Sequence, residues 1–126
     1  MLTELHLSNF KSWRELDIKL GRVTGLFGTN SSGKSSILQF LLMLKQTAES
    51  SDKNLVLDLG GQNQLVNLGS FKDLIFQHRE NLPLMWRVAW SFPDGYERSS
   101  ENFETSVAVV YEDRQIKLWV IRCGRT

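Results

Sequence analysis

The amino-acid sequence predicts an α/β fold with an antiparallel β-rich lobe, and three observations lead to this prediction. A glycine-rich stretch at 28–35 separates a short apolar run from a segment of helix-favouring residues, which is the order strand, loop, helix. Apolar and polar residues alternate before that stretch, as is typical of strands with one wet face. From Leu84 onward, aromatic and β-branched residues, which favour strands, are abundant.

The first fifty residues are expected to form a hairpin, a loop and a helix. Alternation over 5–7 and 16–20 predicts two antiparallel strands, with the turn at Asn9 to Arg14. The nearly continuous apolar run from Val23 to Phe27 predicts a strand buried on both faces. A helix is expected from Lys34 to about Ala48, because that segment lacks proline and glycine. Its large apolar groups lie on most sides, which predicts a buried helix.

The rest of the chain divides into a connecting segment, 51–81, and the β-rich lobe, 82–126. In the connecting segment a short strand is expected at 55–57. Ser70 and Asp73 resemble a capping box that begins a short helix through 74–77. In the lobe, strands are predicted at 85–92, 105–111 and 115–121, with turns at 93–95 and 112–114.

The strongest chemical signal is the stretch 28–35, which satisfies the phosphate-loop (Walker A) pattern G-x-x-x-x-G-K-[ST] at every fixed position. Its small residues let backbone N–H groups converge on phosphate oxygens at the start of a helix. Lys34 would reach the β- and γ-phosphates as the catalytic cation, and Ser35 would give its hydroxyl to Mg²⁺. ATP and Mg²⁺ are thus the expected cofactors, held by Gly28, Thr29, Asn30, Ser31, Ser32, Gly33, Lys34, Ser35 and Ser36. The alternative is a plain strand-to-helix connector, which the flanking strand and helix patterns disfavour.

ATP hydrolysis also needs an acidic residue at the end of a second buried strand. The run 107–113 ends in Glu112 and Asp113, but these acids fall where a hairpin turn is expected, and 55–58 is shorter still. Residues 59–62, Leu-Gly-Gly-Gln, resemble a transporter-type signature but lack its serine, so a loop is favoured. Gln62, Gln64 and Gln77 are candidate metal or water contacts, with solvated side chains as the favoured interpretation. We therefore expect the remaining catalytic parts to lie outside these residues.

Composition sets broad limits. With 41% apolar residues, 23% charged residues and a net charge of +1, the sequence is typical of soluble globular domains. The single cysteine, Cys123, has no internal disulfide partner, and with only His6 and His78 beside it no metal cluster is expected. No signal peptide or membrane-spanning run is apparent, so a cytoplasmic protein without membrane contact is predicted.

The N-terminal residues resemble a known family. The pattern Leu-His-Leu-Ser-Asn-Phe-Lys-Ser at 5–12, the second strand pattern at 16–20 and the loop 28–35 look like the start of the SMC/RecF-type ABC ATPases. The sequence from Gly28 to Gln39 is especially similar to AAA-type ATPases grouped with OLD-family nucleases and phage-defence proteins. The resemblance implies the N-terminal part of one ATPase domain, a partial P-loop NTPase of the ABC-type ATPase head class.

In that family, ATP bound to one subunit is enclosed by the signature motif of a second subunit. The resemblance therefore implies a homodimer with nucleotide, hydrolysis once the C-terminal half is present, and DNA or an effector nuclease as a partner in DNA repair or phage defence. It also places Lys11 and Ser12 near the nucleotide, with a plain hairpin turn as the alternative. Two other functions stay open: a non-catalytic structural or interaction lobe, and a small kinase or GTPase, although no Asn-Lys-x-Asp motif is present.

Overall fold

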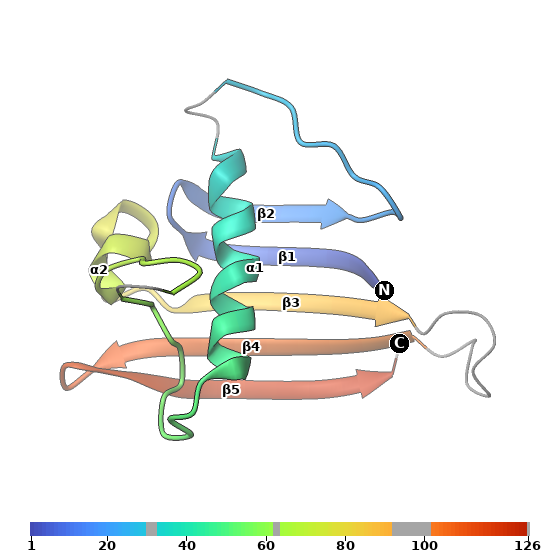
Figure 1. Cartoon of the computed structure of the whole chain (residues 1–126). Coiled ribbons are helices and arrows are strands. Elements are labelled where there is room, and N and C mark those ends of the chain that lie inside the picture. Colours follow the sequence, from blue (N-terminus) through green and yellow to red (C-terminus); the bar gives the residue numbers. More distant parts are fainter. Residues whose placement is uncertain (30–32, 62–63, 92–101, 126) are drawn as a thin grey trace.

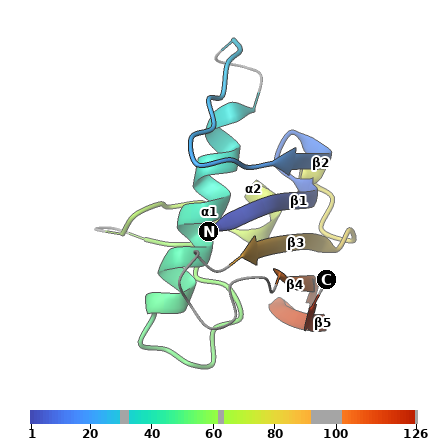
Figure 2. The same ribbon diagram turned by 90° about the vertical axis from the view of Figure 1, so that its right-hand side faces the viewer.

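The computed structural model describes residues 1–29, 33–61, 64–91 and 102–125. Five strands form one antiparallel sheet in the order β2-β1-β3-β4-β5, and the long helix α1 (Lys34–Glu49) lies across one face (Figures 1 and 2). The short helix α2 (Phe71–Leu74) and the 3₁₀ turn η1 (Phe76–His78) flank the same sheet. The strands are β1 (Leu2–Phe10), β2 (Trp13–Lys19), β3 (Leu84–Ser91), β4 (Asn102–Glu112) and β5 (Gln115–Arg125).

The alternating patterns of the sequence mark the two faces of this sheet. In the hairpin of β1 and β2, Leu5 lies opposite Ile18 and Leu7 opposite Leu16, which places the apolar set on the helix side. The predicted hairpin is confirmed, although its turn is tighter than the expected 9–14 and consists of Lys11 and Ser12. The three predicted C-terminal strands and the turn at 112–114 are confirmed as well. The predicted turn at 93–95 lies outside the described residues.

The core lies between α1 and the sheet. Phe40 of α1 is fully buried and meets Phe10 and Trp86 edge to face, with ring centroids 5.3 and 5.6 Å apart. Edge-to-face contact is a favoured arrangement for aromatic rings. The other side chains with at most 1% exposure are Leu5, Leu7, Met43, Leu74, Ile75, Leu84 and Val109. These residues fix the position of α1, and with it the loop that precedes the helix.

The helix prediction is confirmed in extent but corrected in burial. The buried positions Ile37, Phe40, Met43 and Gln46 recur every three residues along one face, whereas Leu38 is 56% exposed. The helix is therefore amphipathic rather than buried on most sides. Leu41 and Leu44 lie between these extremes and are partly buried against the core.

Two predicted strands are absent from the described structure. Residues 23–27 are irregular, and Val23 and Phe27 are 93% and 95% exposed. A strand buried on both faces needs neighbouring strands, and this segment lies beyond β2, the outermost strand of the sheet, without pairing to it (Figure 1). The expected strand at 55–57 is also irregular. The expected α/β class therefore holds only in part, because the described structure is rich in strands and its sheet is wholly antiparallel.

Gln46 ties the connecting segment to α1. The buried Nε2 of Gln46 donates to the carbonyl oxygens of Asp58 and Val66, at 2.8 and 3.3 Å, and its Oε1 accepts from the N–H of Val66 at 3.2 Å. The predicted capping box is present: the carboxylate of Asp73 accepts from the backbone N–H and the hydroxyl of Ser70, at 2.9 and 3.0 Å. These hydrogen bonds lower the pKa of Asp73, the backbone N–H being the larger cause.

Candidate nucleotide-binding site

Gly33 marks the point at which the phosphate loop becomes a helix. It caps the N-terminus of α1 with φ of 87° and ψ of 6°, a left-handed conformation, which costs residues other than glycine roughly 1–2 kcal/mol. A Cβ atom at Gly33 would also lie 2.6 Å from the Oγ of Ser12 and 2.8 Å from the Nε1 of Trp13. Glycine is therefore required here for two separate reasons, conformation and space.

The tip of the β1–β2 hairpin packs against this glycine. The indole Nε1 of Trp13 donates to the carbonyl oxygen of Gly33 at 3.1 Å. Ser12 is exposed and lies beside the same glycine. The structure thus brings Ser12 to the start of α1, at the end of the phosphate loop. The hairpin tip therefore contacts the residue at which α1 begins.

Lys11 faces the helix rather than the loop. Its backbone N–H donates to the carbonyl oxygen of Leu74 at 2.7 Å, and its Nζ donates to the Oε1 of Gln39 at 2.8 Å. Partial burial lowers the pKa of the Lys11 ammonium, and the nearby carboxylate of Asp73 opposes that shift. The ammonium group therefore links the hairpin turn to the second turn of α1.

Lys34 reaches back across the loop. Its Nζ donates to the carbonyl oxygen of Gly28 at 2.6 Å, so the first and the last part of the motif are joined by one hydrogen bond. Asn30, Ser31 and Ser32 lie outside the described residues. Of the other predicted ligands, Thr29 and Ser35 are exposed and Ser36 is half-buried.

The N-terminus of α1 carries positive partial charge with little to offset it. The helix has 16 residues, no side chain bonded as an N-cap and no acid in its first turn. The first-turn N–H of Ser36 donates to the carbonyl oxygen of Gly33 at 3.1 Å. Unpaired first-turn amides and the aligned peptide dipoles favour an anion at such a terminus. The ammonium of Lys34 adds a full positive charge at the same place.

The described residues do not form a cluster of metal-binding side chains. They contain no group of three or more His, Cys, Asp or Glu side chains that could hold a metal ion. Glu112 ends β4 and Asp113 lies in the turn, with φ of 53°, and pairs with Lys117 at 2.9 Å. Gln64 and Gln77 are exposed, and Gln62 lies outside the described residues. The preference for a turn at 112–114 is thus confirmed.

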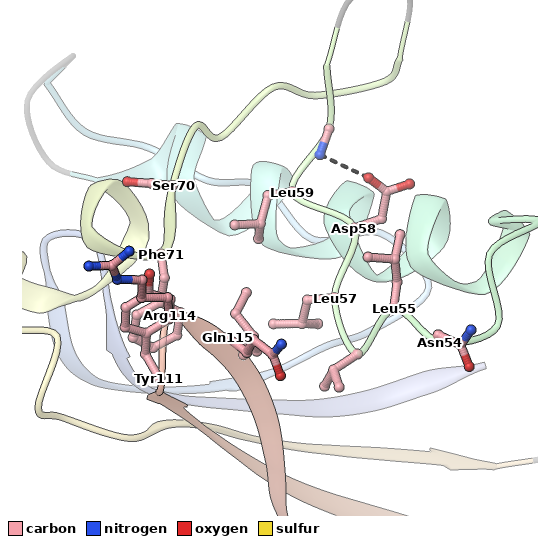
Figure 3. Close-up of a pocket in the computed structure, with 13 residues that line it drawn as sticks. Asn54, Leu55, Leu57, Asp58, Leu59, Ser70, Phe71, Tyr111, Arg114 and Gln115 are labelled. Carbon is pink, nitrogen blue, oxygen red and sulfur yellow. Dashed lines mark hydrogen bonds between the residues drawn. The ribbon is translucent and has the colours of Figure 1, made fainter.

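Residues 59–61 form a loop, as expected. The N–H of Gly60 donates to the Oδ1 of Asp58 at 3.0 Å, and Gly60 has φ of 92°. This loop borders a pocket of about 710 Å³, and Figure 3 shows Asp58 and Leu59 among the residues that line it. The signature-like sequence therefore lies in a turn, and Leu59 and Gly60 line this pocket.

Two residues of the site were missed by sequence reasoning. Trp13 was assigned only to the turn and Gln39 only to the family resemblance, yet they hold Gly33 and Lys11 respectively. An aromatic residue directly after the Lys-Ser turn was the available signal for Trp13. Nothing in the sequence pairs Gln39 with Lys11, because that contact depends on how α1 crosses the hairpin.

No helix in the described part of the chain is long and apolar enough to span a bilayer. No curated protein sequence matches the chain.

A solved structure from a study of ATP-driven dimerization and DNA-stimulated activation of SMC ATPases is similar in fold. The TM-score is 0.51 at 19% sequence identity, and the match covers 99% of this chain and 71% of that one. The model of the AAA ATPase domain family matches residues 1–113, which include the hairpin, the phosphate loop and most of the sheet. The chain therefore belongs to the AAA ATPase domain family and is an ATPase-type segment with an SMC-like fold.

Proposed function

We propose that this chain binds Mg²⁺-ATP on the loop 28–35 and provides the nucleotide-binding part of an ATPase that dimerises with nucleotide. The observation that carries the proposal is the left-handed Gly33 at the mouth of α1, held by Trp13 and flanked by Lys34. Together they bring a helix N-terminus and the side chain of Lys34 to the end of the loop 28–35. This arrangement suits a polyphosphate and few other ligands.

The charges of the described residues suit a triphosphate. The first turn of α1 has no acid to repel it, and within the described residues Lys34 donates to a neutral carbonyl oxygen, that of Gly28. A phosphate oxygen is a stronger acceptor than a carbonyl for an ammonium donor. We therefore propose that Lys34 exchanges the Gly28 carbonyl for the β- and γ-phosphates when nucleotide binds.

Ser35 is the residue proposed to hold Mg²⁺. It is exposed at the first turn of α1, and Mg²⁺ in nucleotide sites is commonly held by one hydroxyl or carboxylate, by phosphate oxygens and by water. When bound, the ion would offset the negative charge of the phosphates. Ser12, beside Gly33, is proposed as a further nucleotide contact. Lys11 is proposed to lie near the nucleotide and to hold the hairpin turn against α1 by its bond to Gln39.

Hydrolysis is proposed for the longer assembly rather than for these residues alone. The acid that would orient water is not among the described side chains of the site, and Val23 and Phe27 next to the loop are almost fully exposed. Both observations support a further part of an ATPase domain that covers this segment and supplies the acid. We propose that two such assemblies enclose ATP between them, and that DNA or an effector nuclease responds to the dimer.

Isothermal titration calorimetry with Mg²⁺-ATP tests the nucleotide site. Lys34→Ala should weaken binding by about 10- to 160-fold, because the substitution removes a charge-assisted bond that contributes about 1.5–3 kcal/mol. Lys45→Ala is the matched control, since Lys45 is an exposed lysine on the same helix. Equal ATP affinity in the two variants would refute the assignment of the loop.

Dimerisation needs a separate measurement. Sedimentation of the chain with and without Mg²⁺-ATP should show a nucleotide-dependent increase in mass that Lys34→Ala abolishes. If ATP binds and the mass does not change, the nucleotide site stands and the proposed dimer of these residues is wrong.

A further inference from the structure

Strand β5 is the free edge of the sheet, and its composition is unusual for an edge. Within the described residues it pairs only with β4, from Gln115 to Arg125, with a register shift that leaves Trp119 without a partner in the register. Its outer row of backbone N–H and C=O groups is therefore available to another strand. Four consecutive apolar residues, Leu118, Trp119, Val120 and Ile121, are exposed by 50%, 62%, 38% and 57%.

These apolar residues point to both faces of the sheet. Leu118 lies opposite Val109 and Ile121 opposite Val107, and both of these β4 partners pack in the core on the α1 side. Val120 lies opposite Ala108 and therefore on the other face. An edge strand with one wet face shows apolar residues on one side only, whereas a strand that is apolar on both sides is typical of a sheet interior.

From Gln115 to Arg122 the two faces of β5 differ in charge. On the α1 side, this stretch carries Ile116, Leu118 and Ile121, which are all uncharged. The other face carries Lys117 and Arg122, opposite Val110 and Ser106. No acid occurs anywhere from 115 to 126. Lys117 is paired with Asp113, while Arg122 makes no ion pair within the described part of the chain.

A pocket lies beside β5 on each face. On the α1 side, Gln115 and Ile116 border the pocket of about 710 Å³, whose other wall is the segment 54–60. Figure 3 shows Phe71, Tyr111 and Arg114 at one end of this pocket and Asn54 and Leu55 at the other. On the opposite face, Trp119 and Arg122 border a pocket of about 420 Å³. Side chains of an added strand alternate between the two faces, so both pockets are within its reach.

From this geometry we propose that β5 is a docking edge for an extended segment of a partner protein, which adds to the sheet as a sixth strand. The partner strand carries aliphatic residues on the face next to Leu118 and Ile121, and acidic residues on the face next to Lys117 and Arg122. Main-chain hydrogen bonds provide affinity and the alternating side chains provide specificity, as in other cases of β-strand addition. A second copy of this chain is a poor occupant, because two β5 strands paired about a two-fold axis would bring their basic side chains together and repel each other.

Fluorescence anisotropy with labelled peptides tests the proposal on the full chain. The probe is a short peptide in which valine and glutamate alternate, and the comparison peptide has lysine in place of glutamate. The glutamate peptide should bind more tightly. Arg122→Glu should weaken it by about 2- to 30-fold, because cross-strand charge pairs contribute roughly 0.2–1 kcal/mol and reversal also adds repulsion. The same variant should strengthen binding of the lysine peptide.

Lys19→Glu is the matched control, since Lys19 is an exposed lysine on β2 at the opposite edge of the sheet. It should leave both affinities unchanged. Hydrogen exchange should slow at β5 amides, and not at β2 amides, when the glutamate peptide is present.

Four outcomes would overturn the proposal. They are no binding of either peptide, equal binding of both, protection at β2 instead of β5, and self-association of the free chain that Arg122→Glu abolishes. An oligothymidylate that binds and displaces the glutamate peptide would likewise overturn it, in favour of a nucleic-acid surface built on Trp119 and Arg122.

Discussion

The substitution Gly33→Ala tests how the hairpin shapes the phosphate loop. Alanine at φ of 87° costs roughly 1–2 kcal/mol for the left-handed backbone. Its Cβ would lie 2.6 Å from Ser12 and 2.8 Å from Trp13, and crowding of this kind costs about 1–3 kcal/mol. The free energy of unfolding should therefore fall by about 2–5 kcal/mol in all.

Urea denaturation followed by circular dichroism measures this change, and the m-value shows whether both variants unfold in the same way. Gly61→Ala is the control, because a Cβ at Gly61 meets nothing within 4 Å. It should shift the midpoint little. The crowding argument is also open to a double-mutant cycle, since Trp13→Phe removes the indole Nε1 that the new methyl group would meet. If Gly33→Ala and Gly61→Ala have equal midpoints, or if the cycle shows no coupling to Trp13, the hairpin does not constrain the loop.

Three further predictions concern the helix and the connecting segment. Phe40→Ala should cost about 3–5 kcal/mol because the ring is fully buried between two aromatic rings, whereas Leu38→Ala, on the exposed side, should change stability by less than about 0.5 kcal/mol in thermal or urea unfolding. Gln46→Met should cost about 1–3 kcal/mol and speed hydrogen exchange around Val66, because backbone groups of the connecting segment lose their partners. Ser70→Ala should raise the pKa of Asp73 in an NMR titration, but leave it below the ordinary range because the backbone N–H still donates. The pKa of Asp73 is lower in the folded state than in the unfolded state. The stability that the carboxylate contributes is therefore present above its unfolded pKa and is lost as the pH falls through the folded pKa.

The sequence predicted the elements whose pattern is local. The hairpin followed from leucines at alternate positions, and the capping box followed from Ser70 and Asp73 three residues apart. The start of α1 followed from the glycine at 33 and the helix-favouring residues after it. Such features need no knowledge of the rest of the fold.

Features that depend on distant contacts were not predictable in this way. The bond from Trp13 to Gly33 joins residues 20 apart, and the bond from Lys11 to Gln39 joins residues 28 apart. Both arise only when α1 packs across the hairpin. The same reasoning explains the helix: Leu38, Leu41 and Phe40 have similar hydrophobicity, and only the position of the sheet decides which of them is buried.

The segment 23–27 is the clearest case in which local pattern and described structure disagree, and it allows a direct test. Its apolar run has the composition of an interior strand, yet Val23 and Phe27 are 93% and 95% exposed. If these side chains contact only water in this chain, replacing both by threonine removes no packing, and the free energy of unfolding should change by less than about 0.5 kcal/mol. The same double substitution should reduce binding of a hydrophobic dye, since it removes two large exposed apolar groups. A loss of more than about 1 kcal/mol would mean that the segment is packed in solution, as two buried apolar side chains would each contribute about that much or more. In that event other residues of this chain already bury the segment 23–27, and the proposal that a further part of the ATPase domain covers it would be wrong.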